Sequence, residues 1–217
     1  MSDLFKFWRR IDPADGVHPD DAPTFKRLNG QHGFSLNCLP LSFTGPLKTA
    51  RVVLLYLSPG LPKGLEGHSR SPELQVLYAK QRTGTAELPD ANSPGHRWRE
   101  SRLSFLGDWE QHRDEIAVFN IGAYHSKEFI DHDVLASLPS SRIALDWAQS
   151  VLFPEAEAGN RVVICMRAAK YWGLRAGQTF GKSLFAPETT RGGHMVAGKQ
   201  REVIIEKARR ALGTRPQ

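Results

Sequence analysis

The sequence predicts a three-layer α/β/α fold built on a short, mainly parallel sheet of four strands. Two observations lead to this prediction. Four short runs of β-branched and apolar residues are separated by segments with helical periodicity, which is the alternation typical of α/β proteins. The clearest runs are apolar at consecutive positions, as expected of parallel strands that helices cover on both faces. Right-handed crossovers between such strands place helices on the two sides of the sheet.

The expected strands cover residues 51–57, 115–121, 161–166 and 182–186, and the last of these is the weakest. The expected helices cover residues 71–82, 98–114, 140–152, 168–174 and 198–212. Ser71 and Pro72 suit the N-cap and the first position of the first helix. In the last helix, one side is apolar, with Val203, Ile204, Ala208 and Leu212. The other side is basic, with Lys199, Arg201, Lys207, Arg209 and Arg210.

The chain of 217 residues is long enough for one well-buried core. Residues 1–45 are rich in Pro, Asp and Gly turn chemistry, and we expect them to form an N-terminal arm packed on a single domain at 46–217. No run approaches the roughly 18 apolar residues of a membrane span. The N-terminus lacks the apolar core of a signal peptide, so a cytoplasmic protein is expected. The only cysteines, Cys38 and Cys165, exclude a disulfide framework and a Cys-rich cluster, and Cys165 is expected to be buried.

The formal net charge of +6 is compatible with a polyanionic partner, because Lys and Arg replace the counterions of phosphates. Basic proteins that bind no nucleic acid are also common. Charge therefore permits a nucleic-acid partner without requiring one.

Ligands of open parallel sheets bind outside the carboxyl ends of the strands, so the loops that follow the four strands are the candidate site. Ser58, Pro59 and Gly60 follow the first strand. They form either an ordinary tight turn or a stiff loop that brings backbone N–H groups close to a ligand.

The loop after the second strand is dense in polar groups. Asn120 lies at the end of the strand, where a carboxamide can both donate to and accept from the edge of a nucleobase. Tyr124 offers a face for stacking, and His125, Ser126 and Lys127 are donors of the type that contact phosphates. The alternative is a capped and solvated loop.

The last two loops add cations. Arg167 and Lys170 follow the third strand at the start of a short helix, where they can meet phosphate; the alternative is a helix whose Trp172 packs in the core. Arg191 and His194 follow the fourth strand in a glycine-rich loop. His194 can stabilise negative charge on a leaving group, because imidazole donates a hydrogen bond or becomes cationic near neutral pH.

Three other segments carry weaker signals. Residues 177–183 resemble a phosphate-binding P-loop but have one residue too few between the glycines and lead into a strand. Residues 131–133 have metal-ligand types without a third cluster nearby, so no metal and no cofactor are expected. Residues 95–99 interleave cations with Trp98, which suits either a nucleic-acid groove or a helix start with a packed Trp.

Residues 48–212 resemble the uracil-DNA glycosylase-like superfamily in the order of strands and loops. The run Tyr56-Leu57-Ser58-Pro59-Gly60 is similar to the first motif of that superfamily, a loop close to Gly-x-Asn-Pro-Gly. Asn120 matches its base-reading Asn, and His194 matches the His that supports the departing base. The run Ala123-Tyr124-His125-Ser126 resembles a loop of poorly characterised branches of the superfamily.

The sequence also departs from that pattern. Ser58 stands where well-studied members have Asp or Asn before the Pro, and a hydroxyl does not activate water as a carboxylate does. His194 is followed by Met195 and Val196 rather than by Pro-Ser, and the four cluster-binding cysteines of some branches are missing.

The resemblance implies a protein that binds nucleic acid, with DNA as the expected partner, and flips a base into a pocket, with hydrolysis of the N-glycosidic bond as the implied activity. In that mechanism Ser58 and His194 are the catalytic candidates. Asn120, Tyr124, Pro59 and Gly60 hold the base, and the cations of the loops hold the backbone. Two alternatives stay open: a non-catalytic nucleic-acid or nucleotide binder that kept the fold, and an unrelated small-molecule hydrolase.

Overall fold

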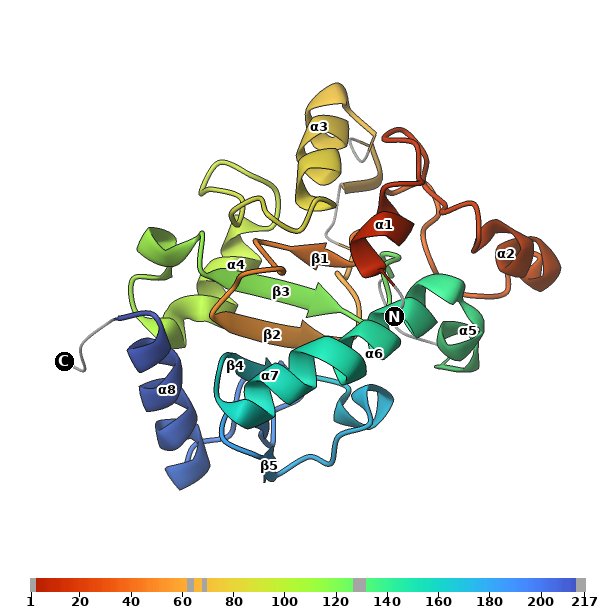
Figure 1. Cartoon of the computed structure of the whole chain (residues 1–217). Helices are drawn as coiled ribbons and strands as arrows, with labels where there is room; N and C mark the ends of the chain where they lie inside the picture. Colours follow the sequence, from red (N-terminus) through yellow and green to blue (C-terminus); the bar gives the residue numbers. More distant parts are fainter. Residues whose placement is uncertain (1–2, 62–64, 68–69, 127–131, 214–217) are drawn as a thin grey trace.

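The computed structural model describes residues 3–61, 65–67, 70–126 and 132–213, and they form an α/β fold around one six-stranded sheet (Figure 1). The strand order is β1-β3-β2-β4-β6-β5. The four central strands run parallel to one another: β3 (Ile116–Asn120), β2 (Val52–Tyr56), β4 (Val162–Cys165) and β6 (Leu184–Ala186). These are the four strands that the sequence predicts.

The predicted number of strands is wrong, because each edge of the sheet carries a further antiparallel strand. β1 (Phe43–Thr44) pairs with β3, and β5 (Gln178–Phe180) pairs with β6. β1 has only two residues and falls within the predicted arm. In β5 two of the three residues are exposed. An edge strand needs no apolar run, so neither strand has the pattern that reveals a buried strand.

Helices cover both faces of the sheet because successive side chains of each strand point to opposite sides. Val53 and Leu55 of β2 pack on the face covered by α1 (Leu4–Trp8), α6 (Pro139–Trp147) and α7 (Phe153–Ala158). The other face, which includes Tyr56, packs against α4 (His96–Leu103), the 3₁₀ segments η2 (Ser104–Leu106) and η3 (Trp109–His112), and α8 (Lys199–Ala211). Figure 1 shows α6 and α7 along one side of β2 and β4.

Two predicted helices are close to their observed bounds. α3 spans Pro72–Gln81, and the Ser71 hydroxyl accepts a hydrogen bond from the Leu74 amide at 3.4 Å. In α8 the side chains of Ile204 and Ala208 are buried as predicted, whereas Val203 is exposed.

The helix predicted at 98–114 is much shorter in the structure. α4 ends at Leu103, and η2 and η3 follow it. Gly107 lies between them with φ of +90°, a conformation that an α-helix cannot include.

The helix predicted at 140–152 is longer than expected. It continues from α6 through a π-helical turn (Ala148–Leu152) into α7 and ends at Ala158. Pro154 accounts for the π turn, because proline has no N–H for a regular helical bond. The Phe153 amide instead bonds to the carbonyl five residues earlier, that of Ala148.

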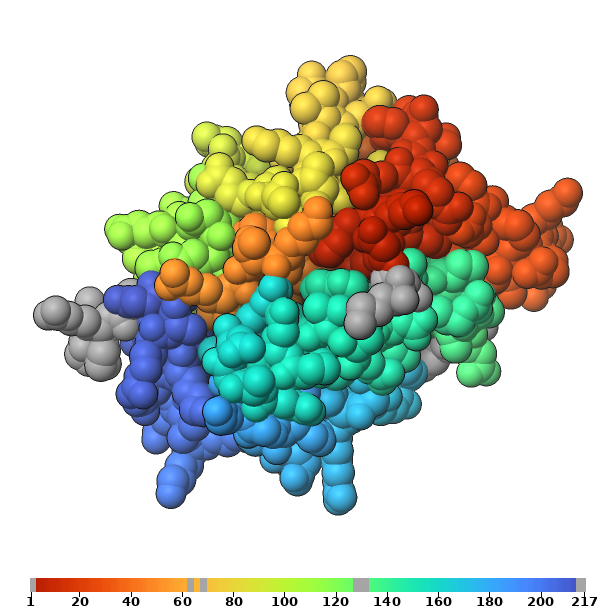
Figure 2. Space-filling model, in the orientation of Figure 1, coloured from red at the N-terminus to blue at the C-terminus, as the bar shows by residue number. Residues whose placement is uncertain are grey.

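The N-terminal segment is more regular than the predicted arm. It contains α1, α2 (Ala22–Leu28) and β1, and Leu4, Phe5 and Trp8 are buried in the core. α1 lies against α6, and Figure 2 shows the segment forming one surface with its neighbours.

Both cysteines are buried, which confirms the prediction for Cys165 and adds Cys38 to the interior. Among the described residues, no helix has the length and apolar character needed to cross a membrane.

Candidate functional site

The carboxyl ends of β2 and its two neighbours lie together at one edge of the sheet. Tyr56, the last residue of β2, is the register partner of Asn120 at the end of β3. On the other side, Leu55 is the partner of Cys165 at the end of β4. The loops that follow these three strands therefore start within one or two strand spacings of each other, where a sheet of this kind binds ligands.

The loop after β2 is tied to the loop after β3. The carbonyl of Gly60, whose φ is +68°, accepts a hydrogen bond from His125 Nδ1 at 2.5 Å. The Gly122 amide donates to the carbonyl of Leu57 at 2.8 Å. A Cβ at Gly122 would lie 3.1 Å from that carbonyl oxygen and 3.9 Å from Cβ of Ser58, so glycine permits this close approach.

Ser58, Pro59 and Gly60 are all half-buried at this point of the loop. Ser58 therefore lies beside the loop after β3, as the predicted site requires. Its hydroxyl lacks the acid–base character of a carboxylate.

Asn120 is held by the chain segment that precedes β1. Its Nδ2 donates to the carbonyl of Leu41 at 3.1 Å, and its backbone amide donates to the carbonyl of Ser42 at 2.7 Å. Only 3% of the residue is exposed. One N–H of the carboxamide is thus used within the fold, and within the described part of the chain no donor bonds to its Oδ1. The side chain keeps the capacity to read a ligand through that oxygen.

Tyr124 does not have the placement that base stacking requires. Its side chain is fully buried, with its ring 4.8 Å from that of Phe25, and its hydroxyl donates to Asp21 Oδ2 at 2.6 Å. Burial and the neighbouring Asp21 carboxylate raise the pKa of Tyr124 well above its usual value. The residue therefore anchors the N-terminal segment, and the predicted stacking role has to be corrected.

His125 and Ser126 are also buried, which removes them from contact with a polynucleotide backbone. Burial lowers the pKa of His125, although the hydrogen bond of Nδ1 with the Gly60 carbonyl and the nearby Leu39 carbonyl oppose this. The predicted phosphate contacts of both residues are therefore corrected: His125 joins two loops of the site from the inside. Lys127 lies outside the described residues.

Tyr56 is the unexpected residue at this edge. Only 3% of it is exposed, and its hydroxyl has no hydrogen-bond partner among the described residues. Burial raises the pKa of Tyr56, while the charges of Arg102 and Arg167 act in the opposite direction. A buried hydroxyl without a partner can be satisfied by a ligand or by an ordered water.

Cations and an aromatic ring surround Tyr56. Trp98 of α4 is 38% exposed, and its ring lies edge-on to that of Tyr56 at 4.9 Å. Arg102 is one helical turn further along α4, on the same face as Trp98. The loop after β4 contributes Arg167, which is exposed.

Arg167 joins the loops after β4 and β6. Its Nη2 donates to the carbonyl of Arg191 at 3.0 Å, and its aliphatic part lies against Gly193. Lys170 is exposed, with its Nζ 4.8 Å from the ring centre of Tyr171.

The predicted helix N-terminus near Arg167 is not a phosphate site of the expected kind. The segment that follows is only a four-residue 3₁₀ helix, η5 (Ala169–Trp172), and Trp172 is fully buried in the core. Ala168 precedes it with φ of +63°, an uncommon conformation for a residue other than glycine.

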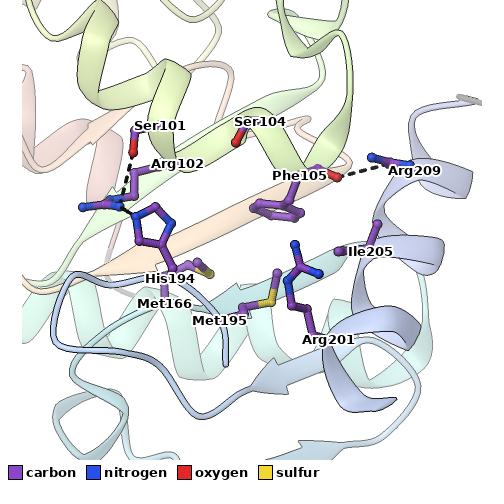
Figure 3. A pocket seen from close by; sticks show the side chains of 10 residues that line it. All are labelled: Ser101, Arg102, Ser104, Phe105, Met166, His194, Met195, Arg201, Ile205 and Arg209. Atoms are coloured by element: carbon purple, nitrogen blue, oxygen red, sulfur yellow. Dashed lines mark hydrogen bonds between the residues drawn. The ribbon is translucent and has the colours of Figure 1, made fainter. Parts of the chain in front are cut away.

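His194 lies in a different part of the same edge. It is exposed, hydrogen-bonds through Nε2 to Nη1 of Arg102, and lines a cavity of about 310 Å³ (Figure 3). Neither Ser58 nor Asn120 is among the residues that line this cavity. The structure thus places Ser58 and Asn120 in adjoining loops, whereas His194 belongs with the cations beyond Tyr56.

The described residues contain one group with metal-ligand types, His96, Glu100 and Glu110, whose ligand atoms lie within 4.8 Å of one another. Glu100 accepts a hydrogen bond from the Trp109 indole at 3.0 Å, and Glu110 lies 3.7 Å from His96. The expectation of no metal stays a prediction.

Sequence analysis missed Tyr56 and Arg102 as site residues. Tyr56 could not be recognised because a strand-terminal aromatic residue is ordinarily core. Arg102 has a detectable signal: it lies four residues after Trp98, in the segment whose mixture of cations and Trp is compatible with a groove.

Comparison with models of known families, with curated proteins and with solved structures gave no match. The resemblance to the uracil-DNA glycosylase-like superfamily therefore stays a prediction.

Proposed function

We propose that the protein binds nucleic acid, DNA in particular, along the carboxyl edge of its sheet and receives one base in the loops after β2 and β3. The observation that carries the proposal is the surroundings of Tyr56. The hydroxyl of Tyr56 is buried without a partner among the described residues, its ring lies 4.9 Å from that of the exposed Trp98, and the charges of Arg102 and Arg167 act on it. Such a group would be satisfied by a polar ligand that also interacts with cations and with an aromatic face.

The backbone of the nucleic acid would lie against the cations. Arg102 and Arg167 come from α4 and from the loop after β4, and Arg191 and Lys170 add charge nearby on exposed side chains. Each cation that neutralises a phosphate releases a counterion, which makes the affinity fall with salt. The net charge of +6 is consistent with this mode of binding.

The base would be stacked and read by different residues. Trp98 takes the stacking role that Tyr124 cannot fill, because it is the large exposed aromatic at this edge. Asn120 offers Oδ1, while the turn at Pro59 and Gly60 leaves room for a close approach of the backbone. Extruding a base costs a few kcal/mol, and stacking of the base offsets that cost by about 1–3 kcal/mol.

Hydrolysis of the N-glycosidic bond is the second candidate function, and the contact between Arg102 and His194 is the observation that favours it. A guanidinium only donates, so in this hydrogen bond Nε2 of His194 accepts and Nδ1 stays available to a ligand. Such an imidazole can donate to a base that departs with the electron pair of the C1′–N bond. Water would form the new bond to C1′, and its proton would go to the base. Ser58 does not line the cavity that contains His194, and a hydroxyl gives little help in activating water, so we expect slow cleavage.

Binding is tested by fluorescence anisotropy with labelled single- and double-stranded DNA. We expect Trp98→Ala to weaken binding about 5- to 100-fold, as for loss of one stacked base, and Trp98→Phe to retain most of the affinity. Arg167→Ala should reduce the slope of log K against log salt by about 1. The matched control is Arg51→Ala, at the amino end of β2, which should leave the slope unchanged.

Cleavage is tested on strands that contain uracil, hypoxanthine or other modified bases, followed by alkali. Breaks at the modified site would establish glycosylase activity. A salt-sensitive complex without breaks would support the binding function and refute cleavage. Absence of both would refute the proposal and favour the unrelated small-molecule hydrolase.

A further inference from the structure

The cavity beside His194 has features that base binding does not explain. It lies between α4–η2 and α8 and is bordered by the loop after β6 (Figure 3). Four of its residues carry basic groups: Arg102, His194, Arg201 and Arg209. We call this cavity the arginine pocket.

Helical spacing in α8 creates one wall of the arginine pocket. Arg201, Ile205 and Arg209 are four residues apart and therefore share one face of the helix. The neighbouring positions Ile204 and Ala208 are buried against the sheet, which fixes the rotation of the helix. Figure 3 shows Arg201 and Ile205 directed from α8 toward the loop that carries His194.

The side of the pocket opposite α8 contains Met195 and Met166, which are buried residues of the core. Only 7% of Met195 is exposed, and its segment is paired to Thr189 through an isolated β-bridge. This arrangement presents the preceding residue, His194, to the cavity. Met166 lies directly after β4 and is buried as well. The apolar side of the pocket is therefore built from residues that the fold keeps in place.

None of the described residues that line the pocket is acidic, so the charges of Arg102 and Arg201 are not balanced by the lining. Arg209 has partners of its own, one of which is the carbonyl of Phe105, to which its Nε donates at 3.1 Å. Arg102 is hydrogen-bonded to Ser101 Oγ and to His194, and neither partner carries a negative charge. For Arg201 no hydrogen bond or ion pair is found within the described part of the chain. The nearby carboxylate of Glu206 pairs instead with Arg210, on another face of α8. Gathering cations in a concave site is unfavourable unless an anion binds there.

The chemistry of the lining indicates what kind of anion fits. Guanidinium groups bind phosphate through paired hydrogen bonds, and the hydroxyls of Ser101 and Ser104 offer further donors. The thioethers of Met166 and Met195 would face a less polar part of the same ligand. A volume of about 310 Å³ is at the small end of ligand pockets, which suits a nucleotide-sized molecule.

We propose that the arginine pocket binds the phosphate group of a nucleotide, with its sugar or base against the methionines. The nucleotide can be free or part of a strand, and the inference does not depend on the proposed function. In a strand, the phosphate in this pocket would extend the bound backbone from the edge of the sheet toward α8.

Calorimetric titration with thymidine 5′-monophosphate, thymidine and inorganic phosphate tests the pocket directly. We expect the monophosphate to bind about tenfold or more tightly than thymidine, because the nucleoside lacks the charged group. It should also bind more tightly than inorganic phosphate, which cannot use the apolar side. Equal binding of thymidine and its monophosphate would overturn the inference.

Variants of α8 locate the binding. Arg201→Ala should weaken monophosphate binding about tenfold or more, as for loss of a charge-assisted contact. Arg210→Ala removes the same charge from the same helix, outside the pocket, and should leave binding unchanged. An equal loss in the two variants would mean that only general charge matters, and the inference would fail.

A labelled single strand separates the two sources of the phosphate. If a strand phosphate occupies the pocket, Arg201→Ala lowers the salt slope of strand binding by about 1, and the monophosphate competes with the strand. Monophosphate binding without strand binding would refute the proposed function and leave the arginine pocket as a free-nucleotide site. Strand binding that Arg201→Ala does not change, together with no monophosphate binding, would refute the arginine pocket alone.

Discussion

Replacing Tyr124 by Phe removes one hydroxyl that joins the loop after β3 to the N-terminal segment. That hydroxyl donates to Asp21 Oδ2 at 2.6 Å and accepts from the His18 amide at 3.2 Å. The other oxygen of Asp21 accepts from the Ser140 amide at the start of α6, at 3.0 Å. Asp21 and His18 are both fully buried, so water does not easily replace the missing group.

The cost can be worked out from these contacts. Loss of a hydrogen bond to a carboxylate costs about 1.5–3 kcal/mol, and a buried amide left without an acceptor costs about 1–3 kcal/mol. The two losses share one oxygen and are not fully additive. We therefore expect Tyr124→Phe to lower the free energy of unfolding by about 3 kcal/mol, which corresponds to a Tm lower by about 6–12 °C for a chain of this size.

Urea denaturation of the wild type and the variant measures this difference. Tyr56→Phe is the matched control, because it removes a buried hydroxyl that has no partner among the described residues. We expect the control to leave the free energy of unfolding unchanged or to raise it, because it removes a buried polar group that has no hydrogen bond to lose. Anisotropy below the melting range should also show that Tyr124→Phe, once folded, binds DNA as the wild type does.

Two results would refute this reasoning. Equal stability of Tyr124→Phe and the wild type would mean that the hydrogen bonds to Asp21 and His18 are not formed. Loss of DNA affinity in the folded variant would mean that the hydroxyl of Tyr124 acts in binding rather than in anchoring the N-terminal segment.

Two further predictions concern stability. Burial lowers the pKa values of His18 and His125 below the ordinary 6.5, so the unfolded chain takes up protons first as the pH falls. The free energy of unfolding is then retained above about pH 6.5 and falls below it by up to about 1.4 kcal/mol per histidine per pH unit. Urea midpoints at pH 7.5 and 5.5 measure this loss, and equal midpoints at the two pH values would contradict the prediction. Gly45→Ala places a Cβ 2.3 Å from the carbonyl oxygen of Ile116 and should cost about 3 kcal/mol or more. Its control Gly30→Ala has a similar positive φ and nothing within 4 Å, so it should cost only about 1–2 kcal/mol, and equal losses in denaturation would show that the contact is relieved.

The central part of the fold was predictable because it depends on burial. Val52–Tyr56, Ile116–Asn120 and Val162–Cys165 are buried at every position, and a short, continuous apolar run is typical of a strand that is covered on both faces. The N-cap of α3 at Ser71 and the bounds of α8 were also predictable, because residue types close in the sequence decide where a helix begins and ends. Edge strands and the π turn depend on neighbours in space, and the sequence carries no comparable signal for them.

The loops show the same division. The sequence predicted that the residues following the parallel strands gather at one edge, and Ser58 and Asn120 do lie in adjoining loops there. Residue types could not reveal that Tyr124 and His125 point inward, because a polar aromatic or an imidazole suits either environment until its neighbours are known.

By itself, then, the sequence determined the α/β class, the order of the four parallel strands along the chain and the loops that follow them. These features depend on apolar periodicity and helix capping, which involve residues that are close in the sequence. Only the tertiary structure decided which polar side chains are available to a ligand. The hydrogen bond between Arg102 and His194 joins residues 92 positions apart, and the arginine pocket brings Arg201 to the same cavity as Met166 and Met195. Such contacts depend on how helices pack on the sheet, and packing is a property of the whole fold.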